Sequence, residues 1–363
     1  MVFLLSQYDN YGSDNDFGNG YPYGDYPYTP KKSFLSKIKD YFLCDRYVKL
    51  SATVTVIGLA IILYQLAAMV YSYILRGVSP ILDRYTNDYM FSTVIEMSYT
   101  VCCVGGSFAV GYILMKKMGL IDRELPFSAP YSASDSVLII VAGLGICFAG
   151  NLVTNFFVSA MSAMGFEFYS YNYALTAPVN LPQNAFELIC MTVHTAVLPA
   201  VFEEFAFRGV IMQPLRKYGD YFAITVSAVA FGLIHGNMTQ MPFAIIAGIV
   251  LGYASIVTGS MWTGVIIHFF NNFLSLLNSF ARESLSEAGI MLFSLITVYG
   301  TIVVGAAALG MYVYKNPHFL RLRGGGYGKH KKSRLALTVL LVPSMTIALI
   351  WMLSALSQDI YFN

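Results

Sequence analysis

The feature that most constrains the fold is a series of long apolar runs, which fill most of the chain after residue 50. A membrane-spanning helix needs about 20 apolar residues, because each residue advances 1.5 Å through a hydrocarbon layer about 30 Å thick. The series predicts an all-α, polytopic transmembrane bundle of about nine helices (eight or nine). The runs lie at 51–75, 91–115, 137–164, 184–213, 221–236, 242–258, 262–281, 289–314 and 335–357.

The fifth and sixth runs are short for membrane spans. Tilting or local thinning of the bilayer would accommodate two such helices. The alternative is a re-entrant pair around the polar stretch HGNMTQ at residues 235–240, where non-helical backbone would line a cavity. Either arrangement leaves the later helices with the same orientation.

The charged residues agree with a membrane protein in both number and position. They make up 12% of the chain, whereas soluble proteins carry about 25%. With the N-terminus in the cytoplasm, the predicted loops place 18 Lys and Arg residues on the cytoplasmic side and 3 on the other. A net charge of +2 gives no reason to expect nucleic-acid binding. We therefore predict a multi-pass membrane protein, with its N-terminus cytoplasmic and the lipid bilayer as its surroundings. The composition of the N-terminal tail and the lack of an organelle signal favour a prokaryotic plasma membrane.

Several strongly polar residues lie inside the predicted spans. A charged group costs roughly 2.5–3.5 kcal/mol at the centre of a membrane helix, so such residues are functional candidates. They are concentrated in three spans: Glu203, Glu204 and Arg208 in the fourth, His235 in the fifth, and His268, Asn271 and Asn272 in the seventh.

Helical spacing separates the roles of these residues, because residues four apart share one face of a helix. Glu204 and Arg208 are four apart and can form an ion pair, which leaves Glu203 without a partner on its helix. His268 and Asn272 have the same spacing. Phe231 and His235 do too, so that Phe231 can form a wall of the site beside the imidazole.

This set of residues can hydrolyse an amide without a nucleophilic Ser or Cys. An apolar pocket disfavours the charged carboxylate, so Glu203 suits a general base that takes a proton from water. His235 can hold or share that water, while His268 and Asn272 can donate hydrogen bonds to the developing oxyanion. We favour a mechanism that requires no cofactor.

Two alternatives remain open at this stage. Glu203, His235 and His268 can also bind zinc or another divalent metal in a two-histidine, one-carboxylate site, although the sequence has no HExxH motif. Hydrogen bonding across helices is the simpler interpretation of a buried polar residue. We prefer that interpretation, or an interfacial position, for the isolated residues Glu96, Glu187, His194, Asn151 and Asn155.

Three short motifs in this order resemble a known family. EEFAFR (Glu203–Arg208) fits EExxxR, FGLIH (Phe231–His235) fits FxxxH, and HFFNN (His268–Asn272) fits HxxxN. This combination is similar to the type II CAAX prenyl endopeptidases and the bacteriocin-processing or immunity proteins, known together as the CPBP intramembrane proteases. The similarity covers roughly residues 184–281.

The resemblance implies endoproteolysis at a catalytic core of four helices. It implies that Glu203 is the base, that His235 helps to activate water, and that His268 and Asn272 bind the oxyanion. Glu204 and Arg208 would shape the site. The expected substrate is a membrane-associated peptide or protein, either lipidated or unmodified. The main alternative is a non-catalytic scaffold or bacteriocin-immunity protein. A proton-coupled transporter ranks lower, because the polar groups are clustered and no inverted repeat is visible.

We accordingly divide the chain into four parts. Residues 1–34 are rich in Tyr, Gly and Asp and are predicted to be a disordered cytoplasmic tail. Residues 35–183 contain N-terminal transmembrane helices and juxtamembrane segments, and residues 184–281 form the peptidase core. Residues 282–363 contain C-terminal helices and a basic cytoplasmic loop at 315–334.

Overall fold

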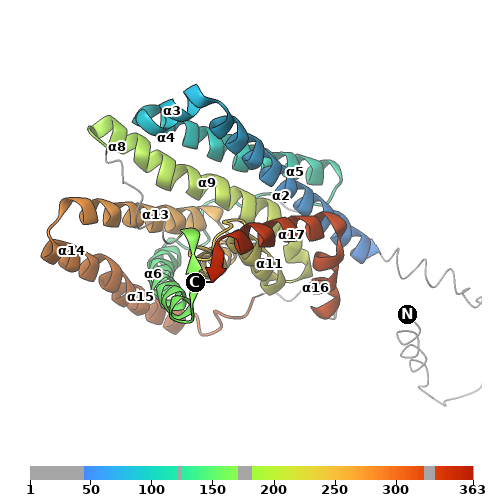
Figure 1. Cartoon of the computed structure of the whole chain (residues 1–363). Helices are drawn as coiled ribbons and strands as arrows, with labels where there is room; N and C mark the ends of the chain where they lie inside the picture. Colours follow the sequence, from blue (N-terminus) through green and yellow to red (C-terminus); the bar gives the residue numbers. More distant parts are fainter. Residues whose placement is uncertain (1–44, 122–123, 171–181, 323–331, 363) are drawn as a thin grey trace, which may run out of the picture. The chain divides into compact units, whose positions relative to one another are not determined.

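The computed structural model describes residues 45–121, 124–170, 182–322 and 332–362 (Figure 1). The predicted tail, residues 1–34, and part of the predicted basic loop lie outside the described residues. Almost all of the described residues are helical, which confirms the all-α prediction.

In the described part of the chain, seven helices are long and apolar enough to cross a membrane. They coincide with seven of the predicted runs. They are α2 (Asp45–Gly77), α4 to α5 (Tyr89–Lys117), α6 (Ala133–Ala163), α8 to η5 (Ala185–Tyr218), α12 (Met241–Thr258), α13 (Met261–Ser284) and α14 to α15 (Glu287–Lys315).

The two remaining runs differ from simple spans. The fifth forms the shorter apolar helix α11 (Asp220–Leu233), and the ninth forms α16 (Lys332–Leu341) and α17 (Pro343–Gln358), which are bent by 78° at their junction. Pro343 explains the bend, because proline disfavours helical backbone at the preceding residue, and Val342 is extended with ψ 122°. Counting the bent pair as one span gives eight among the described residues.

The fourth span is not a regular α-helix. It runs through α8 (Ala185–Thr192), the π-helical segment η3 (Val193–Val197), α9 (Leu198–Glu204) and the π-helical segment η4 (Phe205–Met212). It ends with α10 (Gln213–Leu215) and the 3-10 turn η5 (Arg216–Tyr218). The two π segments therefore flank α9, which carries both glutamates of the first motif, and π-helical turns are frequent at functional sites.

The second and the eighth of the predicted runs also contain π-helical segments. The second span consists of α4 (Tyr89–Tyr99), the π-helical η2 (Thr100–Gly106) and α5 (Ser107–Lys117), and the short α3 (Ser79–Asn87) precedes it. The eighth span consists of α14 (Glu287–Ser294), the π-helical η6 (Leu295–Gly300) and α15 (Thr301–Lys315).

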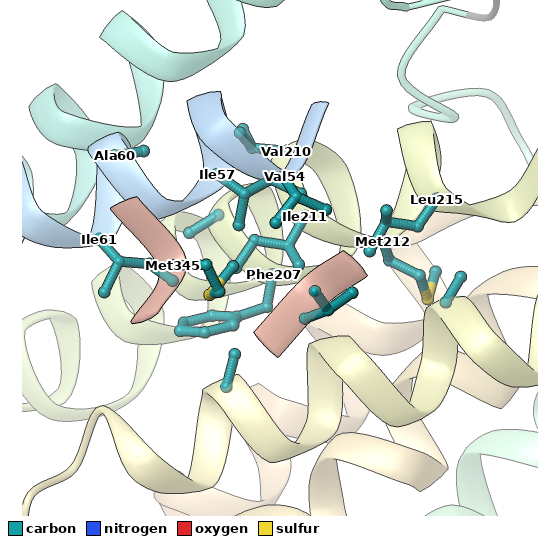
Figure 2. Close-up of a cluster of buried hydrophobic side chains, with 14 of the residues drawn as sticks. Val54, Ile57, Ala60, Ile61, Phe207, Val210, Ile211, Met212, Leu215 and Met345 are labelled. Atoms are coloured by element: carbon teal, nitrogen blue, oxygen red, sulfur yellow. The ribbon is translucent and has the colours of Figure 1, made fainter. Parts of the chain in front are cut away.

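The largest apolar core lies where η4 meets α2 and α17. Phe207 and Ile211 of η4 pack in one cluster with Ile57 of α2 and Met345 of α17, and all four side chains are buried (Figure 2). The whole of η4 after Phe205 is buried. The C-terminal helix, which the motifs do not include, therefore contributes directly to the packing of the helix that carries the first motif.

Two short strands join distant parts of the chain. Strand β1 (Phe166–Phe168), just after α6, pairs antiparallel with β2 (Ile360–Phe362) at the C-terminus. Nothing in the apolar pattern predicted these strands, because each has only three residues. Their pairing holds the C-terminal residues close to the end of α6.

Helices α6 and α15 pack so closely that their backbones touch. A Cβ atom added to Gly145 would lie 2.7 Å from the Cα atom of Gly305 and 3.1 Å from the carbonyl oxygen of Thr301. Small residues allow such close approach between membrane helices, where dispersion contacts replace the hydrophobic effect.

We therefore expect Gly145→Ala to lower the free energy of unfolding by about 1–3 kcal/mol, because the new methyl group meets backbone that cannot rotate away. Thermal unfolding in detergent would measure the change. Gly310→Ala on α15 is the control, since an added Cβ meets nothing within 4 Å there. Equal unfolding midpoints for the two variants would contradict the prediction.

Candidate functional site

All four predicted catalytic side chains line one cavity of about 320 Å³. Glu203 reaches it from α9, His235 from the turn that follows α11, and His268 and Asn272 from α13. Phe231 of α11 lines the same cavity. The structure thus brings together residues that are up to 69 positions apart (203 to 272) in the sequence.

Glu204 does not line this cavity but forms a buried cluster beside it. Its Oε1 lies 3.1 Å from Nη1 of Arg208, and the side chains of both residues are 0% exposed. The same oxygen accepts a hydrogen bond from Nδ1 of His268 at 3.2 Å. Arg208 also donates to the carbonyl of Gly248 at 3.4 Å. The predicted ion pair is therefore formed, and it also holds the imidazole of His268.

Glu203 has a different environment, although it is the next residue. Its side chain is 23% exposed, and its Oε2 lies 3.8 Å from Nε2 of His268. That distance is longer than a direct hydrogen bond, so the two groups are close without being hydrogen-bonded. His268 therefore lies between two carboxylates, with Nδ1 bonded to Glu204 and Nε2 on the side of Glu203.

Phe231 contacts three side chains of the site. Its ring lies edge-on to the rings of His235 and His268, with centroid distances of 5.1 and 5.9 Å. The guanidinium carbon of Arg208 lies 4.7 Å from the centroid of the same ring. One aromatic side chain thus packs against both imidazoles and the buried cation.

The tautomer of His235 follows from its hydrogen bond. Nδ1 lies 2.7 Å from the carbonyl oxygen of Phe231, near the end of α11 where carbonyls lack helical donors. A carbonyl oxygen only accepts, so Nδ1 carries the hydrogen in the neutral ring and Nε2 carries the lone pair.

The polar stretch HGNMTQ forms a tight connection between α11 and α12. Gly236 adopts a left-handed conformation with φ 67°, which glycine tolerates without strain. The side chain of Asn237 donates to the carbonyl of His235 at 3.2 Å and accepts from the backbone N–H of Gln240 at 2.8 Å. The polarity of this stretch therefore serves to close the turn directly after His235.

The amide of Asn272 is oriented by two hydrogen bonds. Its Nδ2 donates to the carbonyl of Thr195 at 3.2 Å, and its Oδ1 accepts from Nδ2 of Asn271 at 3.2 Å. Pro199 helps to explain the first bond, because it has no N–H to donate to the carbonyl four residues earlier. One hydrogen on Nδ2 remains for another acceptor.

The sequence interpretation missed some residues of the cavity wall. Asn151 of α6 was assigned to hydrogen bonding across helices, but it lines the cavity, and so do Asn271, Gln240 and Ser275. Because Asn151 is isolated in an apolar run, the sequence gave no signal that it would line the cavity. The sequence did contain a signal for the bond between Thr195 and Asn272. A proline within a span, here Pro199, leaves the carbonyl four residues earlier without its helical donor.

A metal site was the second possibility for this set of residues. Among the residues that the structure describes, no three His, Cys, Asp or Glu side chains are grouped so that they could hold a metal ion. Glu203, His235 and His268 therefore do not fit a two-histidine, one-carboxylate site as they are arranged. The preference for a cofactor-free mechanism remains a prediction.

The helices and the cavity define a multi-pass integral membrane protein with a pocket of acid, imidazole and carboxamide groups between its helices. Residues 185–274, which are 90 of the 363 residues, match the family model described as Type II CAAX prenyl endopeptidase Rce1-like. This match confirms the predicted resemblance to the CAAX/CPBP family over a segment that contains all three motifs. In general terms, the segment is similar to an intramembrane protease domain of the CAAX type. Comparison with curated proteins and with solved structures gave no significant match.

The buried ion pair leads to a prediction about stability. Arg208→Met leaves the Glu204 carboxylate buried without its cation, so we expect the free energy of unfolding to fall by about 3–5 kcal/mol. Adding Glu204→Gln removes that charge, so the double variant should regain part of the loss. Unfolding midpoints of the single and double variants measure this coupling, and strictly additive losses would contradict it.

Proposed function

We propose that this protein is an intramembrane endopeptidase, which hydrolyses a peptide bond of a membrane-associated, in some cases lipidated, peptide or protein by glutamate-activated water. The observation that carries the proposal is the 3.8 Å separation of Glu203 and His268 in a cavity that His235 and Asn272 also line. The proposed location is a prokaryotic plasma membrane. The distribution of Lys and Arg favours an N-terminus in the cytoplasm.

In the proposed mechanism, Glu203 is the general base. Its partly exposed carboxylate takes a proton from a water molecule, whose oxygen attacks the carbonyl carbon of the scissile bond. His235 accepts a hydrogen bond from the same water through Nε2. The bonding of its Nδ1 to the Phe231 carbonyl supports this role, because it leaves the lone pair on Nε2.

Asn272 and His268 are the proposed donors to the oxyanion. The second hydrogen on Nδ2 of Asn272 suits this role, because the first is already held by the Thr195 carbonyl. Donation from Nε2 of His268 requires the doubly protonated imidazolium, since Nδ1 already donates to Glu204. Such preorganised donors need little rearrangement when the charge develops.

Collapse of the tetrahedral intermediate completes the reaction. The C–N bond breaks as Glu203 passes the proton from water to the leaving amine, so the carboxylate is restored. The non-catalytic scaffold or immunity protein is the competing function.

Activity of the Glu203→Gln variant distinguishes these functions. With a fluorogenic hydrophobic peptide, prenylated on a C-terminal cysteine motif or left unmodified, we expect cleavage by the purified wild type. The variant should lose at least about a hundredfold in kcat while its unfolding midpoint is retained, because glutamine cannot take a proton from water.

Glu187→Gln is the matched control for this experiment. Glu187 lies in the same span, but its carboxylate accepts a hydrogen bond from Asn184 at the start of α8, outside the cavity. Full activity of both variants would refute the assigned base. Absence of cleavage of either peptide by the wild type would favour the scaffold.

Chelator treatment tests the cofactor-free mechanism. Because the three candidate ligands are not grouped as a metal site, we expect EDTA or 1,10-phenanthroline to leave kcat within about twofold of its original value. Elemental analysis of the active protein should find less than stoichiometric metal. Loss of activity that zinc restores would overturn the mechanism.

A further inference from the structure

We infer that Asp359, at the C-terminal end of the chain, is a positioning residue for His235 and acts by holding the 235–240 connection in place. The catalytic part of this inference rests on the proposed function. Neither Asp359 nor its partner Ser170 lies in the segment that matches the family model. The inference therefore assigns a role in the site to the end of α17, which lies outside the three motifs.

The carboxylate of Asp359 accepts hydrogen bonds from two distant parts of the chain. Oδ2 accepts from the backbone N–H of Met238 at 2.8 Å and from Oγ of Ser170 at 2.9 Å. Oδ1 accepts from the backbone N–H of Ser170 at 2.7 Å. All three distances lie in the normal range for hydrogen bonds.

The surroundings of Asp359 strengthen this connection. The residue is 7% exposed, and its carbonyl accepts from the backbone N–H of Tyr169 at 2.8 Å. Ser170 also lies 3.2 Å, oxygen to oxygen, from Oγ1 of Thr239. Pairing of β1 with β2 brings Asp359 to this place, since β2 begins at the next residue.

Met238 lies in the middle of the connection that carries His235. Most of the other side-chain bonds of this turn are local: Asn237 bonds to His235 and Gln240, and Thr239 bonds to Asn237 as well as to Ser170. The bond to Asp359 instead spans 121 positions in the sequence. It fixes the turn against the body of the protein, and with it the direction of the imidazole.

A positioning role predicts a specific change in kinetics. If the turn loosens, His235 holds the attacking water less well, whereas the surfaces that bind the substrate are unchanged. Small misplacements of a catalytic group cost up to about a hundredfold in rate. The effect should therefore fall on kcat and not on KM.

Asp359→Asn and Ser170→Ala are the variants to test. The first keeps the size of the side chain but loses one acceptor, and the second removes only the Ser170 hydroxyl. Tyr361→Phe is the matched control, because the Tyr361 hydroxyl bonds to Glu167 across the β1–β2 pair and not to the turn. Each variant is compared with the wild type by hydrogen exchange, steady-state kinetics and thermal unfolding.

For Asp359→Asn we expect amide exchange in residues 235–241 to accelerate by about tenfold or more. Its kcat should fall roughly ten- to hundredfold, with KM within about twofold of wild type. Ser170→Ala should change both quantities in the same direction but less. Tyr361→Phe should leave both quantities unchanged.

Unchanged exchange in residues 235–241 would overturn the inference, and so would exchange that rises throughout the protein together with a lower unfolding midpoint. The exchange measurement does not depend on activity. Localised exchange in a protein that cleaves no peptide would support the Asp359 contact and refute the proposed function. Unchanged exchange, together with peptide cleavage by both the wild type and the variant, would refute the role of Asp359 and support the proposed function.

Discussion

The buried contact between Glu204, Arg208 and His268 is the interaction on which the site depends. Two ionised groups with 0% exposure are tolerated in an apolar bundle only when they compensate each other. The Gly248 carbonyl, the Phe231 ring and the His268 imidazole also contact this pair. Because these groups come from α11, α12 and α13, the charge pair on the fourth span also fixes where three other helices lie.

This arrangement separates two adjacent glutamates. Neighbouring residues on a helix point about 100° apart, so when Glu204 enters the buried pair, Glu203 is directed to the cavity. Gly264 makes the burial of Glu204 possible, because a Cβ atom at that position would lie 2.9 Å from its Oε2. The proposed base is thus directed by the burial of its neighbour and not by a partner of its own.

The sequence predicted those features that depend on local periodicity. Apolar runs predicted the helices, and the spacing of four predicted the contact of Glu204 with Arg208 and that of Phe231 with His235. Other features depend on long-range or backbone geometry, which spacing does not encode. Asp359 meets Met238 only after the chain has folded, and Asn151 faces the cavity because of how α6 packs. The π segments of the fourth span likewise have no counterpart in the hydropathy pattern.

The hydrogen bonds of the cavity residues distinguish a reactive pocket from a structural polar network. In a network that only joins helices, each buried polar atom should bond to another helix, since an unpaired one is costly. Here, within the described chain, His235 and His268 each bond through Nδ1 and leave Nε2 without a direct hydrogen bond. Asn272 uses one of its two amide hydrogens. Glu203 makes no hydrogen bond to a described residue and lies 3.8 Å from His268. One side of each group is held by the protein while the other faces the cavity, an arrangement that favours binding of water and substrate over helix association alone.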